Sequence, residues 1–153
     1  MREIRFRGKV IGLDSDRDGK WVFGQLVIRP VHECSDDKYF ICETGHRFIR
    51  CLNKMPCTYE VDPETVGQYT GLTDKNGKRI FEGDIVKHYN RMQEPEAYDV
   101  GCIYYDDVHC KWRRTKTDDV DKFNPEIRKN SKYEVIGNIH DNPELIAEVQ
   151  DDI

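Results

Sequence analysis

Apolar and polar residues alternate along much of the first sixty residues, which is the period expected for β-strands with one buried face. Ile4 and Phe6 would lie on one face of a first strand. The opposite face of that strand would carry the cations Arg5, Arg7 and Lys9. After an aspartate-rich turn, residues 21–28 are rich in β-branched and aromatic side chains and stop before Pro30. This pattern predicts a β-hairpin at the start of the chain.

Further short strands are predicted where β-branched and aromatic runs alternate with turn signals. The dipeptide Asn76-Gly77 is a strong hairpin signal, because both residues tolerate positive φ. Asp62 followed by Pro63 could cap a single helical turn, and we place the joint between two β modules there. The remaining strands are predicted at residues 38–42, 47–52, 68–72, 79–81, 85–89, 100–105, 108–114 and 133–139.

The end of the chain predicts a short helix. Asn142 would cap it, Pro143 would take the first helical position, and Leu145, Ile146 and Val149 would line one side. A helix of this kind can cover one face of a small sheet.

The predicted fold class is therefore mostly β, with two small β modules and a short C-terminal helix. The modules would span residues 1–62 and 63–153, or the two could form one compact unit. In the second module, the order of turn, strand, loop and partner strand is typical of an SH3-like barrel.

The net charge and its distribution along the chain bear on whether the protein binds nucleic acid. Charged residues make up 35% of the chain and the net charge is −5. Residues 1–66 carry 11 basic and 11 acidic side chains, whereas residues 67–153 carry 13 and 18. A protein that coats nucleic acid needs a basic footprint, so this balance speaks against a general nucleic-acid coat.

The chain carries no apolar run of about 18 residues, so no membrane-spanning helix is expected. Its charged N-terminus does not lead into the apolar segment of a signal peptide. We therefore expect a cytoplasmic protein with no membrane partner. Cysteines in that compartment are reduced thiols, and here they are Cys34, Cys42, Cys51, Cys57, Cys102 and Cys110.

Three blocks of sequence bear on the family. They are residues 1–7, which read MREIRFR, residues 64–86, which read ETVGQYTGLTDKNGKRIFEGDIV, and residues 135–145, which read VIGNIHDNPEL. In this order they resemble the YopX-like family of phage and prophage proteins. The resemblance implies an origin in a bacteriophage or an integrated prophage, a β-rich fold, and no assigned activity or catalytic residues. Residues 31–59 and 90–131 are much less family-like.

Two groups of residues are candidate metal sites, one for calcium and one for zinc. Asp14, Asp16 and Asp18 followed by Gly19 copy the first half of a calcium loop, but Gln25 stands where the bidentate carboxylate belongs. A solvated hairpin turn is the preferred interpretation. A zinc site would use Cys34, Cys42, Cys51 and Cys57, with His32 or His46. Their spacing is wider than that of zinc knuckles, so no metal ion and no other cofactor is expected.

Catalytic motifs are the next candidates. Ser15, Ser35 and Ser131 do not lie in a nucleophile elbow. The densest polar group contains Asp106, Asp107, His109 and Cys110. It could hold a metal ion or carry out acid–base chemistry, but it is also typical of a turn between two strands. We therefore expect a protein that is not an enzyme.

One segment combines cations with an aromatic ring, the pairing used to bind phosphates and stack bases. The candidate contacts to a nucleic acid or a protein partner are Lys111, Trp112, Arg113, Arg114 and Lys116, extended by Arg5 and Arg7. If the segment is only a strand, Trp112 is buried and neighbours such as Asp118 and Asp119 neutralise the arginines. Small β modules also offer sheet edges, so protein–protein interaction or self-association is the preferred function and nucleic-acid binding the alternative.

Overall fold

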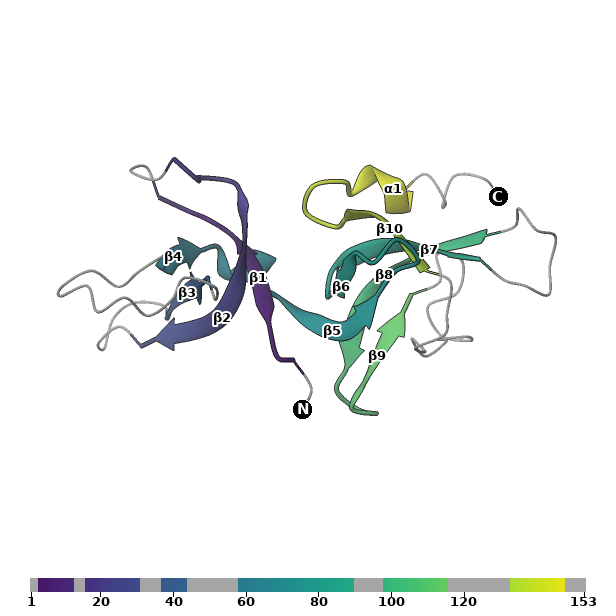
Figure 1. Cartoon of the computed structure of the whole chain (residues 1–153), viewed down its shortest axis with the longest axis horizontal. Helices are drawn as coiled ribbons and strands as arrows, with labels where there is room; N and C mark the ends of the chain where they lie inside the picture. The colour runs from purple at the N-terminus through teal and green to yellow at the C-terminus, as the bar shows by residue number, and fades with distance from the viewer. Residues whose placement is uncertain are drawn as a thin grey trace. The chain divides into compact units, whose positions relative to one another are not determined.

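A computed structural model describes residues 3–12, 16–30, 37–43, 58–89, 98–115 and 133–147. The described part contains ten strands, one 3-10 turn and one short α-helix (Figure 1). The chain divides into two compact units, Met1–Tyr69 and Thr70–Ile153. The mostly β fold in a two-module layout is confirmed. The predicted strand at residues 47–52 lies outside the described residues.

The first unit is a curled antiparallel sheet. Its strands follow the order β4-β3-β2-β1-β5. They are β1 (Phe6–Lys9), β2 (Trp21–Arg29), β3 (Lys38–Cys42), β4 (Thr58–Val61) and the start of β5 (Gly67–Thr73). Residue Val10, just beyond β1, forms an isolated bridge to Val61, and the Ile11 N–H donates to the Glu60 carbonyl at 3.0 Å. The sheet therefore curls until the chain after β1 meets β4.

The curled sheet encloses a small apolar core of Val10, Val22, Ile41 and Val61. Phe6, Leu26, Tyr39, Tyr59 and Val66 pack around this core. Gly8 allows the close approach of the strands, because a Cβ at Gly8 would lie 2.9 Å from the Cβ of Val61. Phe6 packs against the core, whereas Ile4, predicted on the same face, is 64% exposed, and Arg7, predicted on the opposite face, is buried. The predicted alternation therefore holds for Phe6 only, because Ile4 precedes β1 and Arg7 lies against Trp21.

The predicted helical turn after Asp62 is the 3-10 turn η1 (Pro63–Thr65). The Asp62 side chain accepts a hydrogen bond from the Glu64 N–H at 3.0 Å, which is the expected capping geometry. Thr65 Oγ1 accepts the Lys9 N–H at 2.9 Å and donates to the Asp62 carbonyl at 2.7 Å. This turn therefore fastens the end of β1 to the chain that leads into β5.

The second unit contains a hairpin and a four-stranded sheet. The hairpin joins the end of β5 to β6 (Arg79–Phe81), and the sheet has the order β10-β7-β8-β9. The sheet strands are β7 (Asp84–Tyr89), β8 (Tyr98–Asp106), β9 (Lys111–Arg114) and β10 (Tyr133–Asn138). In the described part of the chain, β10 and β9 stay at opposite edges, so the expected SH3-like barrel is not closed.

The core of the second unit consists of Ile80, Val86, Ile103 and Tyr133. Asp74 ties the Asn-Gly turn to this sheet. Its carboxylate accepts the N–H groups of Asn76 and Lys78, both at 2.8 Å, and that of Val135 at 3.1 Å. Gly77 has a φ of 82°, the left-handed conformation that its place in the turn requires.

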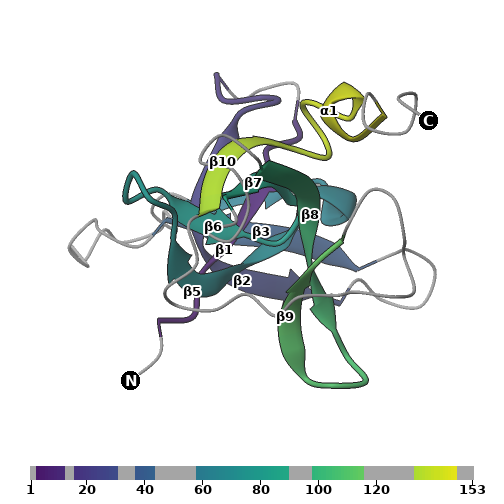
Figure 2. The same cartoon turned by 90° about the vertical axis from the view of Figure 1, so that its right-hand side faces the viewer.

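The predicted terminal helix is α1 (Glu144–Ala147), which follows Pro143. Asn138 Oδ1 accepts the N–H groups of His140 and Asp141, both at 3.0 Å, where β10 ends. In both views α1 lies at the opposite end of the unit from the hairpin tip that joins β8 and β9 (Figures 1 and 2). Among the described residues, no helix is long and apolar enough to cross a membrane.

Candidate functional site

The cationic segment proposed from the sequence forms β9, the edge strand of the second unit. Tyr105 lies opposite Trp112 and Asp106 opposite Lys111 in the register with β8. Trp112 is half-buried, packs against the core of the unit, and meets Tyr105 edge-on with ring centroids 5.0 Å apart. Trp112 is therefore a packing residue of the β8–β9 hairpin, next to the last pair before the turn.

Arg113 is held by a carboxylate of its own hairpin. Its Nε lies 2.6 Å from Asp106 Oδ2, and both side chains are largely shielded from solvent. An ion pair this close occupies the cation that a phosphate would need. The neutralising acid is Asp106, whereas the sequence suggested Asp118 and Asp119, which lie outside the described residues.

Arg114 points into the unit and is only 1% exposed. Its Nη2 lies 3.7 Å from Asp99 Oδ2, and its Nη1 lies 3.5 Å from the Val100 carbonyl oxygen. Gly101 makes room for this side chain, because a Cβ there would lie 2.8 Å from Arg114 Cγ. Arg114 is thus a buried structural cation.

The remaining candidate cations are dispersed. Lys116 lies outside the described residues. Arg5 and Arg7 belong to the first unit, whereas β9 belongs to the second. Arg5 Nε lies 3.3 Å from Glu3, and Arg7 is buried with its guanidinium 4.7 Å from the Trp21 ring centroid. The described arginines of the candidate set therefore all contact groups of their own unit.

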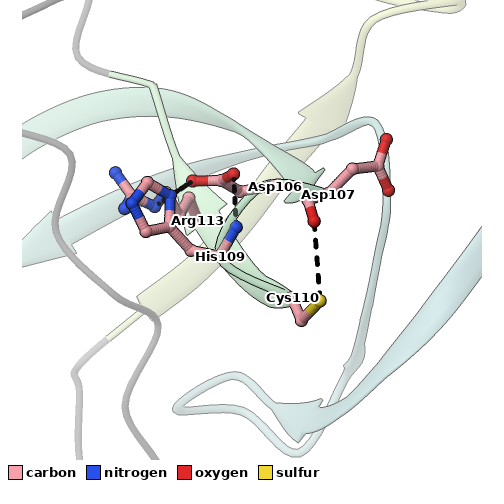
Figure 3. Close-up of polar contacts among 5 residues, drawn as sticks. All are labelled: Asp106, Asp107, His109, Cys110 and Arg113. Atoms are coloured by element: carbon pink, nitrogen blue, oxygen red, sulfur yellow. Dashed lines mark hydrogen bonds and ion pairs between the residues drawn. The ribbon is translucent and has the colours of Figure 1, made fainter.

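The polar group at the tip of the β8–β9 hairpin is built around Asp106. Figure 3 shows His109 and Arg113 converging on its carboxylate. His109 contributes Nδ1 at 2.8 Å and its backbone N–H at 3.1 Å. Burial acts to raise the pKa of Asp106, but the hydrogen bonds from His109 and the charge of Arg113 outweigh it and hold that pKa below its usual value. Asp106 is thus a carboxylate that closes the turn.

Cys110 takes no part in that group. It has a φ of 52°, and its Sγ donates to the Asp107 carbonyl at 3.5 Å, on the side of the turn away from His109 (Figure 3). No nucleophile therefore faces the Asp106–His109 pair within the hairpin. Among the residues that the structure describes, no group of three His, Cys, Asp or Glu side chains could hold a metal ion.

Most residues of the other two candidate metal sites lie outside the described residues. These are Asp14 of the calcium loop, and Cys34, Cys51, Cys57, His32 and His46 of the zinc site. Asp16 and Asp18 lie in a turn closed by Gly19, which has a φ of 70°. Lys20 Nζ donates to the Asp16 carbonyl at 3.0 Å. These contacts are those of a hairpin turn.

One exposed apolar surface was not predicted from the sequence, and it lies on β2. Phe23 is 43% exposed, Val27 41% and Ile28 49%. Residues 21–28 are apolar at positions that face both sides of the sheet, so the sequence predicted a strand there without indicating which of its side chains stay exposed. The small size of the unit could have predicted this exposure, because a unit of this size has too few residues to cover both faces of β2.

The fold and its surfaces define a β-rich protein of two units, with exposed apolar side chains on one strand. The family model described as "YopX protein" matches residues 15–147, and the chain belongs to this family. A solved structure, that of protein EF1440 from Enterococcus faecalis, is 23% identical to the chain. That match covers 95% of this chain and 99% of the other, with a TM-score of 0.42. None of the curated proteins matches the chain.

Proposed function

We propose that this YopX-family protein is a non-enzymatic accessory protein of a phage or prophage, acting in the bacterial cytoplasm by binding another protein. The phage setting is supported by the resemblance of residues 1–7, 64–86 and 135–145 to the YopX-like proteins. Binding to a protein is supported by the exposed apolar side chains of β2.

The observation that carries the proposal is the exposure of Phe23, Val27 and Ile28 on one strand. A single exposed apolar side chain needs no explanation, but Phe23 and Val27 share one face of β2, and Ile28 is exposed at the end of the opposite face. Clustered apolar side chains of this kind are typical of a surface that a partner covers. Arg29 follows them, with its guanidinium 5.1 Å from the Phe40 ring centroid. Aromatic residues and arginine are the side chains that contribute most to protein interfaces.

The alternative function, nucleic-acid binding through β9, draws less support from the geometry. Arg113 is paired with Asp106, and Arg114 is buried beside Asp99. To bind a phosphate backbone, Arg113 would have to leave Asp106, and Arg114 would have to move out of the interior of the unit. Trp112 packs against the core and would also have to move before a base could stack on it.

The test is quantitative affinity purification from bacteria that carry the source prophage. The wild type is compared with a triple variant, Phe23→Ser, Val27→Ser and Ile28→Ser. Val108→Ser is the matched control, because Val108 is an exposed apolar residue at the tip of the β8–β9 hairpin. We expect a protein in near-stoichiometric amount with the wild type and the control, and its loss with the triple variant. Recovery of nucleic acid alone, or of no partner, would contradict the proposal.

A further inference from the structure

We propose that residues 25–29 of β2 form an acceptor edge, to which an extended acidic segment of a protein partner adds as a further β-strand. This inference rests on the proposed function and specifies its surface, its binding mode and the chemistry of the partner. Strand addition supplies affinity through main-chain hydrogen bonds and specificity through alternate side chains.

The first step concerns the pairing of β2. Residues 21–24 pair with β1, with Trp21 opposite Lys9 and Gly24 opposite Phe6. From Gln25 to Arg29, β2 pairs with β3 on its other side. Figure 1 shows the end of β2 diverging from β1. No described strand pairs with the second side of residues 25–29, so this main-chain edge is unpaired within the described part of the chain.

The second step concerns side chains on one face of β2. Val22, Gly24, Leu26 and Ile28 point to the same side, because alternate residues of a strand share a face. Val22 is fully buried in the core, whereas Ile28 is 49% exposed. The exposure rises where β1 no longer runs alongside β2. Ile28 is therefore exposed at the part of β2 that no described strand flanks on the β1 side.

The third step concerns charge. Residues 25–29 carry no acidic side chain, and Arg29 is the cation at their end. The guanidinium of Arg29 lies over the Phe40 ring, while Lys38, opposite Arg29 in the register, is neutralised by Glu60 at 3.0 Å. A carboxylate on the incoming strand would complement Arg29. A second copy of this chain, paired through the same edge, would bring another Arg29 and no carboxylate, so an acidic partner fits better.

A nucleic acid fits this surface less well. Trp21 has the guanidinium of Arg7 4.7 Å from its ring centroid and the ammonium of Lys9 at 5.6 Å, and Phe40 lies under Arg29. These cations already occupy ring faces on which bases would stack. The aliphatic side chains of Val27 and Ile28 offer no stacking surface. An open row of backbone donors and acceptors is instead what a peptide strand can pair with.

The test uses three synthetic peptides of alternating valine and threonine, in titrations of the full chain followed by calorimetry and amide hydrogen exchange. One peptide has glutamate at both ends, one has lysine at both ends, and one is the glutamate peptide with N-methylated backbone amides. We expect the glutamate peptide to bind and to protect amides within residues 25–29. The lysine peptide should bind about tenfold more weakly, and the N-methylated peptide should not bind.

Variants test whether the residues of this edge bind the peptide. Ile28→Ser should weaken the glutamate peptide about tenfold, and Arg29→Glu should reverse the preference between the two charged peptides. Val108→Ser is the matched control, because Val108 is an exposed apolar residue of the other unit, outside β2. Its variant should bind like the wild type.

The proposal of an acceptor edge would be overturned if the glutamate peptide did not bind, or if its N-methylated form bound equally well. It would also be overturned if Ile28→Ser or Arg29→Glu had no effect on binding. Sedimentation showing a dimer that the peptide dissociates would assign the edge to a second copy. Binding of oligothymidine that Arg29→Glu abolishes would assign it to nucleic acid. If the cellular partner still co-purifies with Ile28→Ser and Arg29→Glu, the acceptor edge is wrong while the proposed function stands.

Discussion

The guanidinium of Arg114 lies 3.7 Å from the carboxylate of Asp99, inside a unit where Arg114 is almost fully buried. The aliphatic part of Arg114 packs beside Gly101, so truncation removes packing as well as charge. We expect Arg114→Ala to lower the free energy of unfolding by about 2–4 kcal/mol in urea denaturation.

The control for this prediction is Arg114→Met, which keeps the volume and removes the charge. The Asp99 side chain is 35% exposed, so water can solvate its carboxylate once the arginine is gone, and this variant should stay within about 1 kcal/mol of the wild type. A loss as large as that of Arg114→Ala would show that the charge itself stabilises the unit.

Gly101 should not tolerate a side chain. A Cβ there would lie 1.8 Å from the Thr115 carbonyl oxygen, which is backbone and cannot simply rotate away. Gly101→Ala should therefore lower the free energy of unfolding by about 3 kcal/mol or more. Gly77→Ala is the comparison, because its Cβ would meet open space and only the positive φ opposes it. Its cost should be about 1 kcal/mol. Equal costs in thermal or urea unfolding would contradict the close approach at Gly101.

His88 should make stability depend on pH near neutrality. Burial lowers the pKa of His88, and the charge of Arg114 lowers it further. As the pH falls below about 6.5, the ordinary value for histidine, the unfolded chain takes up a proton that the folded chain resists. Because the unfolded state then binds more protons, stability falls with the pH. Urea denaturation between about pH 7.5 and about pH 5.5 should show a smaller loss for His88→Gln than for the wild type. An equal loss would show that His88 does not contribute.

Nucleic-acid binding through β9 should be absent. Titration of single- and double-stranded DNA and RNA at low salt should give no salt-sensitive micromolar binding, because Arg113 and Arg114 contact Asp106 and Asp99. The Arg113→Ala, Arg114→Ala pair serves as the comparison. Salt-sensitive binding by the wild type that the pair abolishes would make β9 a nucleic-acid interface.

Much of the architecture was accessible from sequence because local signals specify it. Gly77 has the positive φ that the Asn-Gly turn requires, Asp62 caps the turn at Pro63, and a short helix follows Pro143. Each of these elements depends on residues a few positions apart. The alternation that places Phe6 against the core is likewise a property of a single strand, but it does not account for the exposure of Ile4 or the burial of Arg7.

Contacts between distant strands were not accessible in the same way. Nothing local marks Asp99 as the partner of Arg114, or Asp106 as the partner of Arg113, because register decides both contacts. The open edge of β2 was missed for the same reason. A strand signal predicts that residues 21–28 pair, but not that β1 ends its pairing at Gly24.

The central claim is that the chain binds a protein through β2, and photo-crosslinking in bacteria that carry the prophage tests it most directly. A benzoylphenylalanine is placed at Val27, or at Val108 as an exposed control in the other unit. We predict one discrete protein adduct from position 27 and none from position 108. An adduct from position 108 alone, or no protein adduct from either position, would contradict the claim.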